Sequence, residues 1–138
     1  MIDTIFALFV LFAAHCIGDY PLQGEFLAQF KSKSIFVLLC HCTIYTAVIM
    51  IGFWVLGLQH IGDIHMWSIN VYTDFMFVIF LTHFVIDKIK CIYRDAISKE
   101  FNGNMNHPDA HKEDVLGFYV DQFLHCLVLI IIYIMYIV

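Results

Sequence analysis

Four long apolar runs constrain the fold of this chain more than any other feature. They cover about residues 2–20, 35–58, 71–91 and 115–138. Each run provides about the 20 apolar residues that a helix needs to cross roughly 30 Å of hydrocarbon. A backbone in lipid must satisfy its own hydrogen bonds, so spanning runs of this length predict helices. The sequence therefore predicts one domain over residues 1–138, an all-α integral membrane bundle of four transmembrane helices.

The composition supports a membrane protein and argues against nucleic acid as a partner. Hydrophobic residues make up 62% of the chain and charged residues 14%, whereas soluble domains carry roughly 25% charged residues. The formal net charge of -5 comes without a basic stripe of the kind that nucleic acid requires. The five cysteines form no CxxC pair, and we interpret them as small buried residues in a reducing compartment. We expect membrane lipids to surround the protein and to be among its partners.

A short polar segment follows the first run. Pro21 interrupts the helical pattern, and Gln23 and Lys31 then alternate with apolar residues such as Phe26. This pattern is typical of a short amphipathic helix that lies in the membrane interface. We therefore expect residues 21–34 to form a loop with an interfacial helix.

The basic residues predict the orientation. The connection 59–70 between the second and third runs carries no lysine or arginine, and a second polar loop is expected at 92–114. By the positive-inside rule, loops 21–34 and 92–114 are cytoplasmic. Both termini then face outward, in a multi-pass protein of the bacterial inner membrane. The seven basic residues are Lys31, Lys33, Lys88, Lys90, Arg94, Lys99 and Lys112.

Three of the four runs carry a histidine and an aspartate four residues apart, which places both side chains on one helix face. An ionisable group at the bilayer centre costs about 2.5 to 3.5 kcal/mol, so such pairs are expected to face partners inside the protein. At the helical rise, all lie within roughly 5 to 15 Å of the predicted cytoplasmic boundary. The members are the pairs His15 and Asp19, His83 and Asp87, and Asp121 and His125, together with His41 in the second run.

Imidazole and carboxylate groups gathered in one layer indicate a divalent metal site. This ligand set suits zinc first, with manganese, iron or nickel as alternatives. Seven candidates exceed the four ligands of one tetrahedral site, so one metal with supporting residues and two metals both remain open. The predicted metal ligands are His15, Asp19, His83, Asp87, Asp121 and His125.

From a metal site at this depth we predict a membrane-embedded hydrolase that acts at the cytoplasmic leaflet on a phospholipid, a phosphoester or another anionic substrate. A bound metal would lower the pKa of its water towards about 7. His41 is expected to act as a ligand, a supporting residue or a proton shuttle, and the predicted catalytic residues are His41 and Asp121. Basic and amide side chains near the cytoplasmic mouth are expected to attract and orient the substrate. The predicted substrate-binding residues are Gln23, Lys88, Lys90, Arg94 and Gln122.

Four ordered motifs carry a resemblance to a known family. They are the stretch from His15 to Gln23, the isolated His41, the stretch from His83 to Lys90 and the stretch from Asp121 to His125. Together they resemble a family of small bacterial and phage membrane proteins, the domain-of-unknown-function family 3307. The resemblance implies a multi-helix inner-membrane protein and no particular activity. The chain is also loosely similar to membrane-bound metal-dependent hydrolases, which place histidine and aspartate at helix ends.

Two other classes of function remain open at this stage. Intramembrane histidine and aspartate chains also mark metal-ion or proton transporters. Alternatively, the metal is structural and the protein is a non-catalytic interaction partner, and small bundles of this kind also form homodimers. A second histidine group, His107 and His111, precedes the last run, and we interpret it as a solvated polar loop rather than a metal site or a lid.

Overall fold

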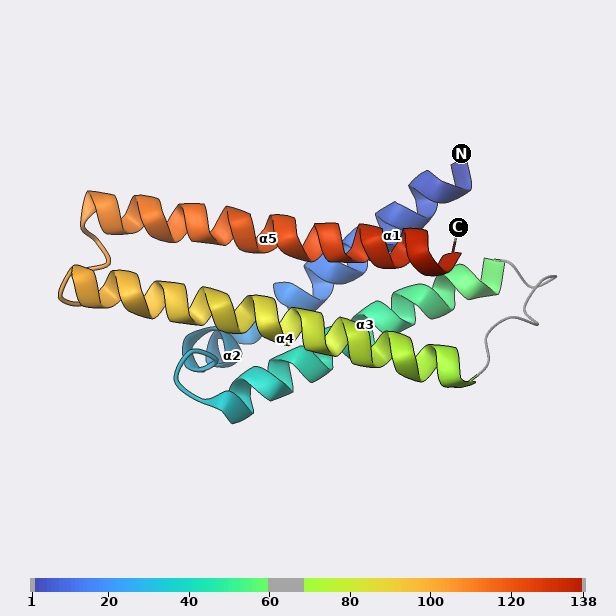
Figure 1. Cartoon of the computed structure of the whole chain (residues 1–138), viewed down its shortest axis with the longest axis horizontal. Helices are drawn as coiled ribbons and strands as arrows, with labels where there is room; N and C mark the ends of the chain where they lie inside the picture. Colours follow the sequence, from blue (N-terminus) through green and yellow to red (C-terminus); the bar gives the residue numbers. More distant parts are fainter. Residues whose placement is uncertain (1, 60–68, 138) are drawn as a thin grey trace.

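The computed structural model describes residues 2–59 and 69–137, and the described residues contain helices and no strands. Helix α1 and the short helix α2 are followed by three long helices (Figure 1). The bounds are α1 Ile2–Asp19, α2 Gly24–Phe30, α3 Ile35–Gln59, α4 Ile69–Glu100 and α5 Pro108–Ile137. The all-α prediction is confirmed, and α2 is the short helix expected after the first apolar run.

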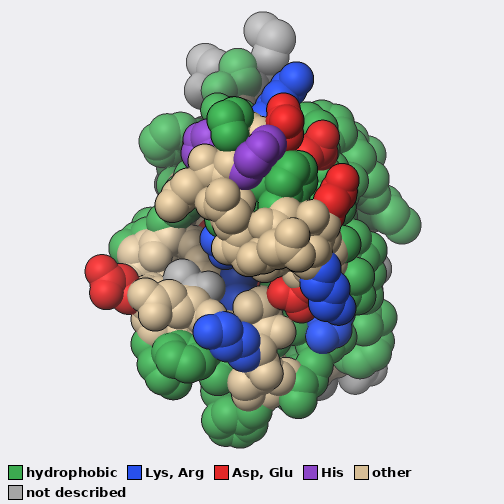
Figure 2. All heavy atoms as spheres, turned by 90° about the vertical axis from the view of Figure 1, so that its left-hand side faces the viewer, with side chains coloured by type: hydrophobic (Ala, Val, Ile, Leu, Met, Phe, Trp, Pro, Cys, Tyr) green, Lys and Arg blue, Asp and Glu red, His purple; other side chains and the backbone are tan. Residues whose placement is uncertain are grey.

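The long helices form a bundle whose two ends differ. Helices α4 and α5 run side by side as an antiparallel hairpin, while α1 packs on α3 and crosses behind α5 (Figure 1). The first turn of α1 and the last turn of α5 lie at one end. The opposite end, formed by residues 24–34 and 94–112, carries α2 and the α4–α5 turn, and we call it the basic end. In Figure 2 charged side chains gather on this end and hydrophobic side chains flank it.

Most of the predicted loop 92–114 is helical, because α4 and α5 extend into it from both sides. Helix α4 ends where Asn102 and Gly103 adopt positive φ angles of 50° and 81°. The Gly103 N–H donates to the carbonyl of Ser98 at 2.7 Å, which satisfies a carbonyl that the helix leaves unpaired. Pro108 then opens α5 at the first helical position, where its missing N–H costs nothing.

Two helices in the described part of the chain, rather than four, are long and apolar enough by themselves to cross a membrane. They are Ile35–Leu56 in α3 and Pro108–Met135 in α5. The apolar part of α1, Thr4–Asp19, is shorter. In α4, Asp74 and Asp87 bracket the apolar stretch, so it falls short of the usual spanning length. By length and composition alone, the prediction of four spans is therefore reduced to two.

The bundle has an apolar core and an apolar exterior. Side chains such as Leu11, Ile49 and Phe75 are almost fully buried between the helices. Large hydrophobic side chains also point outward, and Phe36 and Met135 are each 70% exposed. A soluble protein rarely exposes so much contiguous apolar surface, so this exterior suits an apolar environment. The predicted outer connection, with His60, Asp63 and His65, lies outside the described residues.

Candidate metal centre

The structure brings the three predicted pairs and His41 together between four helices, at the basic-end side of the apolar core. All seven side chains are at least 95% buried. This agrees with the expectation that the pairs share one layer. The helices contribute His15 and Asp19 from α1, His41 from α3, His83 and Asp87 from α4, and Asp121 and His125 from α5.

Helical spacing positions each pair. Residues four apart lie one turn apart on the same face, so the two side chains of a pair meet. His83 Nε2 lies 3.7 Å from Asp87 Oδ2, and His125 Nδ1 lies 3.7 Å from Asp121 Oδ1. His125 Nδ1 also lies 2.9 Å from the backbone carbonyl of Asp121. A carbonyl only accepts, so Nδ1 of His125 carries a hydrogen and its Nε2 is left for another partner.

His41 connects the pairs of α1 and α4. Its Nε2 lies 3.3 Å from Asp19 Oδ1 and 3.2 Å from Asp87 Oδ2. The same nitrogen lies 3.0 Å from Nε2 of His83. Two carboxylate oxygens and two imidazole nitrogens therefore surround one small volume, and one of the two nitrogens must carry a hydrogen for them to lie 3.0 Å apart. An uncompensated buried charge is costly, so the carboxylates at this point call for a proton on an imidazole or for a metal cation.

Gln122 and Tyr45 hold the histidines in place. Gln122 Oε1 accepts from His15 Nε2 at 3.0 Å, and its amide donates to Asp19 Oδ2 at 2.8 Å and Asp121 Oδ2 at 3.0 Å. The Tyr45 hydroxyl lies 3.1 Å from His15 Nδ1. Both ring nitrogens of His15 thus have partners, so this predicted ligand supports the site rather than offering a free nitrogen. Gln122, predicted to bind substrate, holds members of the cluster together.

Two lysines enter the cluster from the basic end. Lys31 Nζ lies 2.9 Å from Asp87 Oδ2, and Lys90 Nζ lies 2.6 Å from Asp121 Oδ2. Burial lowers the pKa of the Lys31 ammonium, but the nearby carboxylates, led by Asp87, raise it more, so its net pKa lies above the ordinary value. With its amide turned to satisfy both partners, Gln23 accepts from Lys31 at 2.8 Å. Lys31 is therefore charged, and Lys31 and Lys90 each pair with one of the three carboxylates.

The remaining predicted residues lie away from the cluster. Arg94 pairs with Asp114 at 3.3 Å on the surface, and Lys88 forms no ion pair with any residue that the structure describes. His107 stacks on the ring of Phe101 with centroids 4.9 Å apart, which closes the α4–α5 turn. His111 is exposed on the first turns of α5. The second histidine group is thus part of the turn and is separate from the buried cluster.

Several buried atoms of the cluster make no hydrogen bond. Polar atoms in a protein interior are normally paired, and each exception requires a reason. A metal ion would provide one, because the available ligand atoms fall into three sets whose members lie within 4.8 Å of one another. The unpaired atoms are Oδ1 of Asp19, Asp87 and Asp121, Nδ1 of His41 and His83, and Nε2 of His125. The sets are Asp19, His41 and His83; Cys42, His83 and Asp87; and Asp19, Asp121 and His125.

Sequence reasoning missed three residues at this site. Tyr45 follows His41 by four positions, a spacing that signals a shared helix face, and its ring stacks on His83 at 3.6 Å. Cys42, interpreted as a small buried residue, is fully buried and also belongs to one ligand set. Lys31 entered the sequence analysis through the charge asymmetry of the loops and the polar pattern of the interfacial helix, and was not expected at the cluster. Nothing local to its sequence indicates that it reaches a carboxylate on α4.

The fold and this cluster define a class: a helical bundle with an apolar exterior and a buried histidine–aspartate centre. Within that class, the chain belongs to the family described as protein of unknown function, DUF3307, which matches residues 7–138. Membership in domain-of-unknown-function family 3307, which the four motifs indicated, is therefore confirmed. No curated protein and no solved structure matches the chain.

Proposed function

We propose that this protein is a membrane-embedded, metal-dependent hydrolase that acts on a phospholipid, a phosphoester or another anionic substrate near the basic end. One observation carries the proposal: a buried cluster of histidines and aspartates that leaves six polar atoms without hydrogen bonds. A divalent cation would satisfy these atoms and neutralise the carboxylates. Anionic groups of a substrate would be drawn to the same end by its lysines.

We further propose that α1, α3, α4 and α5 all lie in the bacterial inner membrane. Helices α1 and α4 are less suited to cross alone, but their outward faces are apolar, with Phe9 66% exposed and Phe77 64% exposed. Of their charged residues, Asp19 and Asp87 are buried inside the bundle, whereas Asp74, near the start of α4, is exposed. Polar groups inside a bundle are shielded from lipid by the neighbouring helices. The basic end then faces the cytoplasm, and both termini face outward.

The residues present fit a metal ion. The unpaired atoms come from α1, α3, α4 and α5 together, so a metal bound to them would link all four helices. Zinc suits the histidine-rich set best, with manganese or iron as alternatives, and the three overlapping sets allow one or two ions. When bound, such an ion supplies an acidified water and stabilises negative charge on the substrate. The ligands we propose are Asp19, His41, His83, Asp87, Asp121 and His125.

The chain's own residues would supply proton transfer and substrate binding. His41 Nε2 touches Asp19, Asp87 and His83, so this nitrogen can hold a proton among them, while Nδ1 makes no hydrogen bond and is left for a metal ion. Asp87 Oδ2 pairs with the Lys31 ammonium at 2.9 Å and also belongs to a proposed ligand, so Lys31 would lose this partner if Asp87 held a metal ion. The released Lys31, together with Lys90, would then bind an anionic group of the substrate, because an ammonium pairs readily with phosphate or carboxylate oxygens.

A transport function has less support. Among the described residues, the buried polar and charged side chains are the seven of the cluster and Thr46, and the other side chains of the buried core are apolar. An ion path through a bundle normally needs such groups along its length. The polar cluster therefore opens towards one end only in the described part of the chain. A polar site that opens to one end of the bundle favours an enzyme over a transporter that moves ions across the membrane.

The test is metal analysis followed by turnover. Purified protein in detergent is analysed for bound metals and then assayed with phospholipids and soluble phosphoesters. We expect bound zinc and hydrolysis in the wild type, and loss of both in His83→Ala and Asp121→Asn variants that keep their helical content. His111→Ala, an exposed histidine of the same helix as Asp121, is the matched control and should behave as wild type. Absence of metal from the wild type contradicts the proposal, and metal without turnover favours a structural role.

A further inference from the structure

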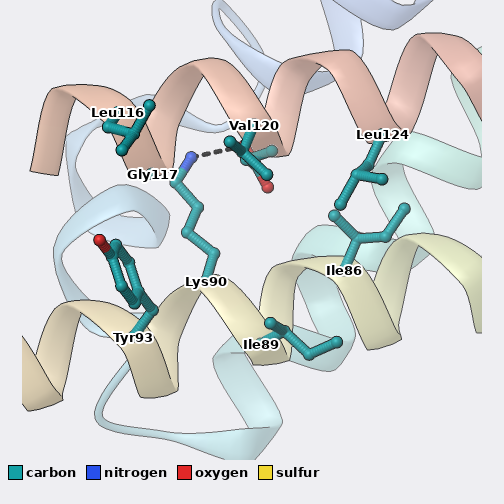
Figure 3. Close-up of a pocket in the computed structure, with 9 residues that line it drawn as sticks. Ile86, Ile89, Lys90, Tyr93, Leu116, Gly117, Val120 and Leu124 are labelled. Carbon is teal, nitrogen blue, oxygen red and sulfur yellow. Dashed lines mark hydrogen bonds and ion pairs between the residues drawn. The ribbon is translucent and has the colours of Figure 1, made fainter. Parts of the chain in front are cut away.

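A cavity of about 280 Å³ lies between α4 and α5, directly beside the cluster (Figure 3). Its size approaches the lower limit of small-molecule sites, which occupy about 300–1,000 Å³. The apolar wall residues are Ile86, Ile89, Tyr93, Leu116, Val120 and Leu124. In Figure 3 they extend from both helices around an open space, so the cavity is an apolar groove between neighbouring turns.

One charged pair lies in this apolar groove. Lys90 extends across it from α4 and meets Asp121 of α5 at 2.6 Å (Figure 3). Asp121 is one of the proposed metal ligands and is 97% buried, whereas the Lys90 side chain keeps a quarter of its surface exposed. The groove thus joins an apolar wall to an accessible cation and, through Asp121, to the candidate metal centre.

A glycine shapes one end of this groove. A Cβ atom at Gly117 would lie 2.9 Å from the ring of Tyr93, which is closer than real contacts allow. The absence of a side chain therefore lets the Tyr93 ring pack against the backbone of α5. The Tyr93 hydroxyl donates to Glu113 and is held there. The ring closes the groove on the side of the basic end.

We infer that this groove binds one acyl chain of an anionic phospholipid, with the lipid phosphate on Lys90. The inference rests on the proposed function and names its substrate class. The apolar walls suit a hydrocarbon chain. The Lys90 ammonium can pair with a phosphate, and it would hold that phosphate beside Asp121, a proposed metal ligand. A lipid bound in this way would present its headgroup ester bonds to the cluster.

A second cavity in the described part of the chain lacks this combination. This cavity has a volume of about 200 Å³ and lies between α1 and α5. It is lined by Leu8, Leu11, Phe12, Cys126, Leu129 and Ile130. It is similarly apolar but contains no charged residue. A hydrocarbon chain alone would have no reason to prefer one groove, whereas an anionic lipid would prefer the groove with Lys90. The second groove therefore serves as an internal control.

The experiment uses a photoreactive lipid. The full chain is placed in nanodiscs of phosphatidylcholine that contain a small fraction of phosphatidic acid with a diazirine on one acyl chain. After irradiation, mass spectrometry locates the crosslinks. We expect them on the α4 and α5 residues that line the first groove, and we expect unlabelled phosphatidic acid to compete better than phosphatidylcholine. Val120→Phe should reduce crosslinking by roughly tenfold, the loss expected when about two buried methylene contacts disappear.

Two controls make the result decisive. Ile130→Phe adds bulk at a similarly exposed position of α5 but in the second groove, and it should leave crosslinking at the first groove unchanged. Lys90→Met should abolish the preference for phosphatidic acid. Equal labelling of both grooves, an effect of Ile130→Phe equal to that of Val120→Phe, or equal competition by phosphatidylcholine would overturn the inference. Crosslinking is read separately from metal content and turnover, so a metal-free protein that still crosslinks would contradict only the proposed hydrolase.

Discussion

The Lys31 ammonium lies 2.9 Å from Oδ2 of Asp87, a carboxylate with no exposed surface. Asp87 is also a proposed metal ligand, so the lysine and a metal ion would compete for it. In the absence of metal, Lys31→Met should destabilise the protein by about 3–5 kcal/mol, because it leaves a buried charge uncompensated. With zinc, the same variant should bind the metal at least about tenfold more tightly, a gain of 1.4 kcal/mol. Calorimetric titration and thermal unfolding in detergent measure the two effects.

Lys33→Met is the matched control for this prediction. Its ammonium lies over the ring of Phe30 at 5.6 Å and forms no ion pair with any described residue. This substitution should change neither zinc affinity nor stability by more than a few tenths of a kcal/mol, the usual effect of surface changes. Weaker zinc binding in Lys31→Met would show that Lys31 supports the metal instead of competing with it.

Gln122 holds two carboxylates and one imidazole, so its loss should weaken metal binding without removing a ligand. Residues that orient metal ligands typically contribute about 10–100-fold in affinity, and Gln122→Ala is expected to lose that much. Asp19→Asn, which removes a ligand charge, should lose more. Zinc titration monitored by a competing chelator gives both values. Gln29→Ala, an exposed glutamine of α2, should bind zinc as tightly as the wild type, and a Gln122→Ala variant with unchanged affinity would rule out the orienting role.

Gly18 allows α1 to approach Tyr45 closely. A Cβ atom there would lie 3.1 Å from the ring and 3.4 Å from the Cα atom of Tyr45. Gly18→Val should therefore displace Tyr45 from His15 and cost about 1–3 kcal/mol, as overpacking in a core does. Ile17→Phe adds bulk at the neighbouring, half-exposed position and should be nearly neutral. Thermal unfolding compares the two, and equal unfolding temperatures would mean that the contact with Tyr45 is not tight in solution.

The proposed orientation can be tested in intact cells with a membrane-impermeant thiol reagent. Asn104→Cys, in the α4–α5 turn at the basic end, should stay unlabelled until the cells are opened. Asp63→Cys, in the predicted outer connection, should be labelled directly. The native cysteines are buried or partly buried, so their background should be low. Direct labelling of Asn104→Cys would reverse the proposed topology.

The helices and the cluster could be predicted from the chain because their signals are local. A helix brings residues four apart to one face, so His83 and Asp87, like Asp121 and His125, were expected to act as pairs. The distribution of lysines predicted that the pairs share one layer, and the contacts that His41 and Gln122 make with pairs on other helices agree with it. The helix ends were harder to predict. The stretch 92–114 contains polar residues that suit a loop and an exposed helix equally well.

The sequence by itself determined the helical class, the family and the residues that meet in the cluster, since hydropathy and helical spacing act over short stretches of chain. Only the tertiary structure decided how each charge is compensated. Lys31 and Asp87 are separated by 56 positions, and no periodicity relates them. In the sequence, His15 is equivalent to the other histidines. In the structure, Tyr45 and Gln122 contact both of its ring nitrogens, so it has none free for a metal. Compensation of buried charge depends on distances between helices, and these are set by packing.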